Sequence, residues 1–480
     1  TIRFLCLCMI QYDRAVSFAK PVLKMKFTVK NLASASRLKC VGIFGLFVVV
    51  GCKTPPMPAN DTDQHIQSAA SLATAIKFHT NALPVEATAE PNRLPLSGAI
   101  EQSLRQSPEI QIALAKVRTA QSAAKQSRLF PNPILNVVLR QPEGGRSTII
   151  EAGLAAKLTE LLQRPRRISA ADAQLRAASA NAVTTTLDVI HDTQQNYFKI
   201  VALQKEAAIL TARSASLSKL LRVTEVRLAA GEGTQLDVTT LRAELATANL
   251  DRREANRKIK AAKYALAHRL GQPAGRIDWE LVTPLYTQIA LRIEGDAIKH
   301  GLLVRPEIQT DRWQLAALED ATALAKLTWL EGAAAGLNTE RDANWSLGPS
   351  VTLPLPIFVN GQARREDARA QAIASRQRLT QTTRQVTVEI REAHDAVAEL
   401  MTTTRHVRTR LLPLHEQRVT LARKVFEAGQ EDVTRLRLAE LDHLEAQLKH
   451  IQLQHQTTSA ILRLDRATGG STLEIKNENN

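Results

Sequence analysis

The chain of 480 residues repeats part of itself at a fixed distance of 198 residues. The stretch "PEIQ" at 108–111 recurs at 306–309. One such match arises by chance, but agreement at one spacing without gaps indicates a duplicated architecture. The same offset superposes Ala99-Ile100 on Ala297-Ile298, Arg166-Arg167 on Arg364-Arg365, Gly231 on Gly429, and Gly271 on Gly469. We therefore expect two similar repeats, at about 94–271 and 293–470, joined by a linker over 272–292, and a function that needs both.

Long stretches without glycine or proline predict unusually long helices. In the first repeat, 166–230 is unbroken, and as one helix it would extend about 98 Å. A turn "AAGEG" and a second unbroken stretch over 234–270 follow, which predicts a helical hairpin. The second repeat has the same order: 362–412, an interruption at Pro413, the turn "FEAGQ" and a helix to about 468. On that last helix a coiled-coil-like seam is expected at Val433, Leu436, Leu441, Leu444, Leu448 and Ile451.

Each repeat also contains two segments with the period of a β-strand. Apolar and polar residues alternate over about 134–140 and 148–158, on either side of the turn "PEGG". The second repeat alternates over about 345–355, after a poorer strand at about 333–340. Soluble hairpins alternate in this way, but strands of about ten residues with one apolar face are typical of transmembrane β-barrels.

Aromatic residues near the strand ends favour the membrane interpretation, because the chain is otherwise poor in them. These membrane-interface aromatics are Phe130, Trp329, Trp345 and Phe358. Four strands cannot close a barrel, and an open sheet edge cannot be left in lipid. We therefore predict a mainly α fold with transmembrane β, in which the strands of three chains form a trimeric twelve-stranded β-barrel.

The N-terminal part has the pattern of an export signal. Residues 25–51 hold a basic stretch and a short apolar run, and "VVGC" resembles a bacterial lipoprotein signal with Cys52 as the lipid-bearing residue. The alternative is a buried strand with an ordinary thiol. Residues 1–24 are expected to be an upstream extension, 52–93 a polar tether and 471–480 a tail. The other three cysteines precede Cys52, so no internal disulfide is expected.

The formal charge of +16 does not indicate nucleic acid. Eight of the basic residues and one acidic residue lie within 1–51, which leaves 55 basic and 46 acidic residues and a net charge of +9. This excess is spread along the chain, and no basic run carries interleaved aromatics.

From about 94 to 470 the chain resembles the TolC-type outer-membrane factor family, with weaker features of its metal-efflux branch. The matching stretches are "AIEQSLRQSPEIQ" with "AIKHGLLVRPEIQ", "LPLPIFVNGQARREDARAQA", "AAGEGTQLDVTTLRAELATANLD" and "FEAGQEDVTRLRLAELDHLEAQL". The resemblance implies an outer-membrane homotrimer, a periplasmic α-barrel built from the duplicated long α-helical hairpins, and an exit duct. It further implies a periplasmic adaptor and an inner-membrane pump of RND or ABC type as partners.

The resemblance also implies that the two helix turns dock the adaptor and gate the duct. The residues so marked are Gly231, Thr234, Asp237, Gly429, Asp432 and Arg435. Relatives often carry Asp six residues after the turn glycine; Asp237 keeps this pattern, whereas Arg435 departs from it. Whether the gate is acidic or basic is therefore open, and simple helix capping is the alternative role of both glycines.

No enzyme motif is present. The nearest candidate, the E-x-x-H of Glu440 and His443, has no second copy to complete a di-iron site. The isolated His191, His268 and His394 are expected to be ordinary helix residues. We expect no cofactor, and the alternative to an efflux channel is a periplasmic coiled-coil scaffold, which would have no use for lipid-facing strands.

Overall fold

The structure, a computed structural model, describes residues 78, 93–141, 148–273, 277, 279–282, 291–341 and 344–470. The expected upstream extension, signal peptide and C-terminal tail, Cys52 and almost all of the tether lie outside the described residues. Two compact units divide the chain. Among described residues one unit holds 119–175 and 316–372, and the other holds the remainder.

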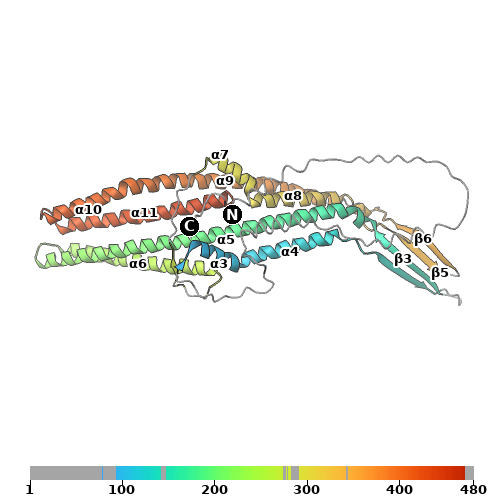
Figure 1. The fold of residues 1–480 in the computed structure, drawn as a ribbon, viewed down its shortest axis with the longest axis horizontal. Coiled ribbons are helices and arrows are strands. Elements are labelled where there is room, and N and C mark those ends of the chain that lie inside the picture. Colours follow the sequence, from blue (N-terminus) through green and yellow to red (C-terminus); the bar gives the residue numbers. More distant parts are fainter. Residues whose placement is uncertain are drawn as a thin grey trace, which may run out of the picture. The chain divides into compact units, whose positions relative to one another are not determined.

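The first unit is built around a four-stranded antiparallel sheet in the order β2-β3-β5-β6 (Figure 1). The strands are β2 (Ile134–Arg140), β3 (Ile149–Lys157), β5 (Ala334–Arg341) and β6 (Trp345–Thr352). All four strands predicted from the alternation are therefore present. β2 and β6 form the two edges of the sheet.

The last strand is shorter than predicted. β6 ends at Thr352, whereas the alternation continues to Leu355. Pro354 and Pro356 lack the N–H that a strand ladder needs, so the alternating leucines that follow Thr352 no longer belong to a strand.

The helices form two hairpins, as predicted. The first consists of α5 (Leu158–Ala229) and α6 (Gln235–Arg269). The second consists of α9 (Gln362–His406), a π-helical segment (Val407–Leu411), α10 (Leu412–Glu427) and α11 (Val433–Ala467). Shorter helices precede each long helix: α3 (Leu96–Gln106) and α4 (Pro108–Arg128) in the first repeat, α7 (Glu294–Val304) and α8 (Pro306–Ala325) in the second.

Two details of the long helices correct the sequence reading. α5 begins at Leu158, directly after β3, and continues through Pro165 instead of starting beyond it. The interruption near Pro413 begins six residues earlier, because Pro413 offers no N–H to the carbonyl of Thr409 and the preceding turn widens into a π-helix.

The duplication is visible in the core of the second unit. Shifting α3 and α6 by 198 residues gives the bounds of α7 and α11. The two apolar clusters use matching residues, with Ala99, Ala262 and Leu266 in one and Ala297, Ala460 and Leu464 in the other. A two-residue parallel pairing of β1 (Arg93–Leu94) with β4 (Glu280–Leu281) borders the first cluster.

The predicted seam of α11 is only partly correct. Leu436 is buried, but the other predicted members are half-buried. One set of buried positions recurs every seven residues and is mostly small: Ala439, Ala446, Leu453, Ala460 and Ala467. Small residues let the helices approach closely, so Leu441, Leu444 and Leu448 lie beside this contact line.

Candidate functional site

One face of the four-stranded sheet is apolar and uncovered. The strand register places Leu135, Leu154 and Leu337 in one row across the sheet. Besides Thr339 and the exposed Arg341, this face carries a set of large exposed apolar residues: Leu135, Val137, Leu139, Leu154, Leu337, Trp345, Leu347 and Val351. Leu347 is 74% exposed. A continuous apolar face of this extent needs lipid or another apolar surface to cover it.

The opposite face is mostly polar. Its side chains include Asn136, Arg140, Glu151, Lys157, Asn338, Glu340, Ser346, Ser350 and Thr352. Arg140 donates to Glu151 at 3.0 Å, and the Ser350 hydroxyl donates to Asn338 at 3.2 Å. Such a sheet is suited to separate an apolar from an aqueous compartment.

The predicted interface aromatics lie at both ends of the sheet. Trp345 starts β6 at the turn end, where the guanidinium of Arg341 lies 5.7 Å from its ring. The other end of the sheet, where β2 begins and β3 leads into α5, is the helix end. The segments that flank it hold Phe130, Trp329 and Phe358. All four are exposed. Among the described residues, no helix is both long and apolar enough to cross a membrane.

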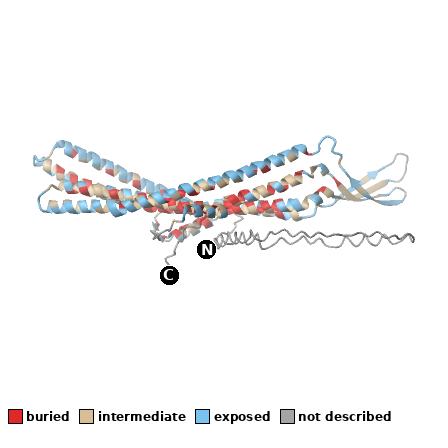
Figure 2. Ribbon diagram, turned by 90° about the horizontal axis from the view of Figure 1, so that it is seen from above, coloured by how far each residue is buried: buried red, intermediate tan, exposed pale blue. Residues whose placement is uncertain are grey.

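The two hairpin turns are built alike at the residues expected to dock a partner. Gly231 and Gly429 have φ of +78° and +69°, which favours glycine. In each turn the glycine N–H donates to the carbonyl three residues back (3.0 and 2.9 Å), and the next N–H donates to the carbonyl five residues back (2.9 and 3.1 Å). Both turns are therefore Schellman motifs. Both are exposed, as Figure 2 shows, and a Cβ added to either glycine meets no atom within 4 Å.

The helices that follow the turns start differently. Thr234 caps α6 in a capping box: the Asp237 N–H donates to the Thr234 hydroxyl at 3.1 Å, and the Thr234 N–H donates to the Asp237 carboxylate at 3.2 Å. Asp432, at the matching position, forms no capping box at the start of α11. Arg435, which replaces the second acidic residue, pairs with Glu431.

The Asp432 carboxylate instead joins the two hairpins. It accepts a hydrogen bond from the Thr434 hydroxyl at 2.6 Å and pairs with Arg227 near the end of α5. Burial alone would raise the pKa of Asp432, but these hydrogen bonds and the Arg227 charge hold it below its ordinary value. Sequence reasoning missed Arg227, because its counterpart at the 198-residue offset is Val425 and no pattern marks it.

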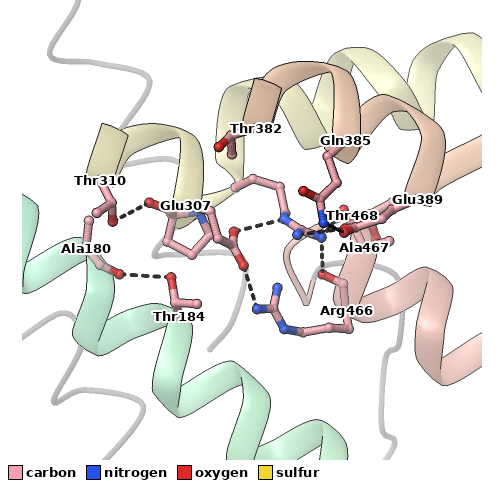
Figure 3. Close-up of polar contacts among 12 residues, drawn as sticks. Ala180, Thr184, Glu307, Thr310, Thr382, Gln385, Glu389, Arg466, Ala467 and Thr468 are labelled. Carbon is pink, nitrogen blue, oxygen red and sulfur yellow. Dashed lines mark hydrogen bonds and ion pairs between the residues drawn. The ribbon is translucent and has the colours of Figure 1, made fainter. Parts of the chain in front are cut away.

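A second polar cluster explains the repeated "PEIQ" (Figure 3). Glu307 pairs with Arg466 at 2.5 Å and with Arg305 at 2.9 Å. Arg466 also reaches Asp188 on α5 at 2.7 Å. In the first repeat Glu109, the matching glutamate, pairs with Arg269 at 3.0 Å. The glutamate of each "PEIQ" thus binds an arginine in the last turn of the second helix of its hairpin.

A cavity of about 620 Å³ lies beside this cluster, between α5, α9 and α11. Its lining includes His191 and His455, whose pKa values are lowered first by burial and also by the nearby cations Arg466 and Lys199 respectively. Glu440 pairs with Arg437 at 2.5 Å, and His443 is hydrogen-bonded to Gln447 at 2.8 Å. No cluster of three potential His, Cys, Asp or Glu ligands occurs in the described part of the chain.

Comparison with known proteins identifies the architecture. The family model "Outer membrane efflux protein" matches residues 99–272 and 304–470. The cobalt-zinc-cadmium resistance protein CzcC of Cupriavidus metallidurans is 22% identical over 399 residues, which are 81% of this chain and 93% of CzcC. The pyoverdine export outer membrane protein OpmQ of Pseudomonas aeruginosa is 25% identical over 319 residues, 60% of this chain and 66% of OpmQ.

Solved structures share the fold. The outer-membrane channel OprN superposes with a TM-score of 0.67 at 20% identity, over 84% of this chain and 95% of OprN. The outer membrane protein VceC of Vibrio cholerae gives a TM-score of 0.65 at 20% identity, over 79% of this chain and 97% of VceC. The matched family is one of transport proteins, which favours the efflux channel over the scaffold. With its duplicated hairpins and four strands, the chain belongs to the outer membrane efflux protein family.

Proposed function

We propose that three copies of the chain form the outer-membrane exit duct of a tripartite efflux system. The observation that carries this proposal is the four-stranded sheet, which has one apolar exposed face, one polar face and two unpaired edges. In lipid, each backbone N–H or C=O group at an unpaired strand edge lacks a hydrogen-bond partner. Each such group costs roughly several kcal/mol, as any buried polar group without a partner does. Pairing β6 of one copy with β2 of the next removes every edge, and three copies give a barrel with a polar lumen.

The helices support the same closure. By the duplication, the contact of α11 with α5 should have a counterpart at α6, and that counterpart needs a second copy of the chain. α11 packs on α5 of the first hairpin: Gln195 and Ser459 are hydrogen-bonded at 2.9 Å, and Leu462 is buried in the first-repeat cluster. The counterpart of Leu462 on α6 is Tyr264, which is 56% exposed. Among the described residues this position of α6 is therefore exposed, and α9 and α10 of a second copy are the counterpart of α5 that fits it.

The hairpin turns are the docking and gating site in this proposal. They are exposed, they are joined by Arg227 and Asp432, and their glycines leave open space around the backbone. The partners are a periplasmic adaptor, whose helical hairpins meet the turns, and an inner-membrane pump of RND or ABC type that supplies the cargo. Gly231, Thr234, Asp237, Gly429, Asp432 and Arg435 all belong to this surface.

Replacing Gly429 separates docking from helix capping. Gly429→Asn is the control, because Asn tolerates a positive φ, whereas Gly429→Trp adds bulk in the same backbone conformation. We expect the Trp variant to form a normal trimer but to lose adaptor co-purification and export by more than about tenfold, while the Asn variant retains both. Export by the Trp variant with a normal trimer would contradict docking, and failure of both variants to assemble would mark the turn as structural.

We further propose that Cys52 carries a lipid anchor in the outer membrane. The basic stretch, apolar run and "VVGC" before it support this assignment. Mass spectrometry of the mature N-terminal peptide should find acylated Cys52. An unmodified thiol, or acylation that persists in Cys52→Ser, would contradict it.

The cargo class we propose is divalent transition-metal ions. The support is the match to CzcC over nearly its whole length, whereas OpmQ matches over two thirds. Deleting the gene should lower tolerance to cobalt, zinc or cadmium. Unchanged metal tolerance together with lost export of an organic compound would contradict this assignment.

A further inference from the structure

Pairs of adjacent arginines recur at matching positions of the two repeats, close to the helix end of the sheet. Arg166-Arg167 stand nine and ten residues after the end of β3, and Arg364-Arg365 are their counterparts at the 198-residue offset. We propose that these two arginine pairs bind the phosphate groups of anionic phospholipids in the leaflet from which the helices leave the sheet. This proposal rests on the insertion of the sheet into the membrane.

Helix stability does not account for the second pair. Arg364 and Arg365 stand in the first turn of α9, which begins at Gln362. The positive end of the helix dipole disfavours cations there, and that turn contains no acidic residue. The first pair lies two turns inside α5, which begins at Leu158. The two arginine pairs thus occupy the same position within their repeats, although their distances from the start of the helix differ.

The ion pairs of this region leave positive charge available. Arg166 pairs with Asp320 at 2.9 Å and Arg364 pairs with Glu331, yet the two arginine side chains remain 62% and 64% exposed. Arg167 has no acidic partner among the described residues, and Arg365 donates to the carbonyl of Asn360 at 2.8 Å. Exposed guanidinium groups can bind phosphate oxygens with two parallel hydrogen bonds.

An apolar segment beside the second pair favours a lipid over a free phosphate. Between the end of β6 and the start of α9, Ile357 is 74%, Phe358 97% and Val359 81% exposed. In the first repeat the Arg164 guanidinium lies 4.1 Å from the centre of the Phe130 ring. Apolar side chains that enter the acyl boundary next to arginines that reach the headgroups are typical of interfacial lipid binding. The segment follows β6 in the chain and stands shortly before the arginine pair, so one ligand with both a phosphate and acyl chains fits it.

Native mass spectrometry of the full chain, purified in detergent, tests the proposal with phosphatidylglycerol and phosphatidylcholine as probes. We expect the wild type to retain phosphatidylglycerol preferentially. Neutralising either pair, with R166Q/R167Q or R364Q/R365Q, should lower that preference by about tenfold, since each surface cation near an anionic bilayer contributes a several-fold factor. R364K/R365K should keep most of it.

Arg252-Arg253 on α6, another adjacent pair, provides the matched control. R252Q/R253Q should leave the preference unchanged, and glycerol phosphate, the headgroup without acyl chains, should not compete. An unchanged preference in both pair variants would overturn the proposal, as would equal loss in the control or competition by glycerol phosphate. A wild type that extracts without detergent would instead overturn the membrane insertion, so the two failures are distinguishable.

Discussion

At the scale of single residues, Glu307 shows what a repeated motif marks. Glu307 lies in the second "PEIQ" and is held by Arg305 and Arg466, whose side chains are only 7% and 14% exposed. The sequence predicted that the motif is duplicated, and it predicted the turn glycines from their type. It could not identify Arg466 as a partner of Glu307, because Arg466 comes from a distant part of the chain and nothing in local spacing selects it.

Removing the Glu307 charge should destabilise the helical unit. In E307Q Arg466 keeps Asp188 and Arg305 keeps Glu389 as acidic partners, so the loss should be about 1.5–3 kcal/mol, the range for hydrogen bonds to charged groups. Glu101 and Arg105 form an exposed pair, so E101Q should cost at most about 1 kcal/mol. Denaturant unfolding followed by circular dichroism in detergent measures both. Equal, small losses would show that the cluster contributes little to stability.

His191 and His455 should make the protein sensitive to mild acid. Their pKa values lie below the ordinary value of 6.5, with burial as the first cause, so folding favours the neutral rings. Their contribution to stability is fully present above about pH 6.5 and is lost as the pH falls through the lowered pKa values. The lowered pKa of Glu307 acts separately, below about pH 4.5.

We therefore expect the melting temperature to fall between about pH 7.5 and pH 5, and to fall less in H191Q/H455Q. Thermal melts at the two pH values measure the difference. The same fall in the wild type and the double variant would contradict the role of these histidines.

At the scale of elements, alternation and glycine turns predicted the four strands and the two hairpins. Apart from the seam of α11, the errors concern element bounds next to prolines, which lack an N–H. Pro354 and Pro356 follow the end of β6, and Pro413 follows a π-helix, whereas Pro165 is accommodated inside α5. The position of a proline in the sequence does not show whether it ends a strand, widens a helix turn or is accommodated inside a helix.

The two faces of the sheet can be compared at adjacent residues of β5. Leu337 lies on the apolar face and is 41% exposed, and Asn338 lies on the polar face. Leu337→Arg should cost about 2–4 kcal/mol of membrane stability, because it places a charge on the lipid side. Asn338→Arg should cost far less. Urea unfolding from lipid vesicles provides the comparison, and equal effects would mean that the faces are wrongly assigned.

At the scale of the whole molecule, the duplication predicted the architecture, and the four strands, too few to close a barrel, predicted closure by three copies. In the described chain the two repeats leave one edge of β2 and one edge of β6 unpaired, and Tyr264 on α6 exposed. A second copy of the chain would cover these surfaces, and the sequence of one copy does not say which residues meet there. The mass of the complex extracted from outer membranes therefore tests the central claim most directly. Multi-angle light scattering should give three chains per particle, obtained only with detergent, and a monomer or dimer released without detergent would contradict the duct.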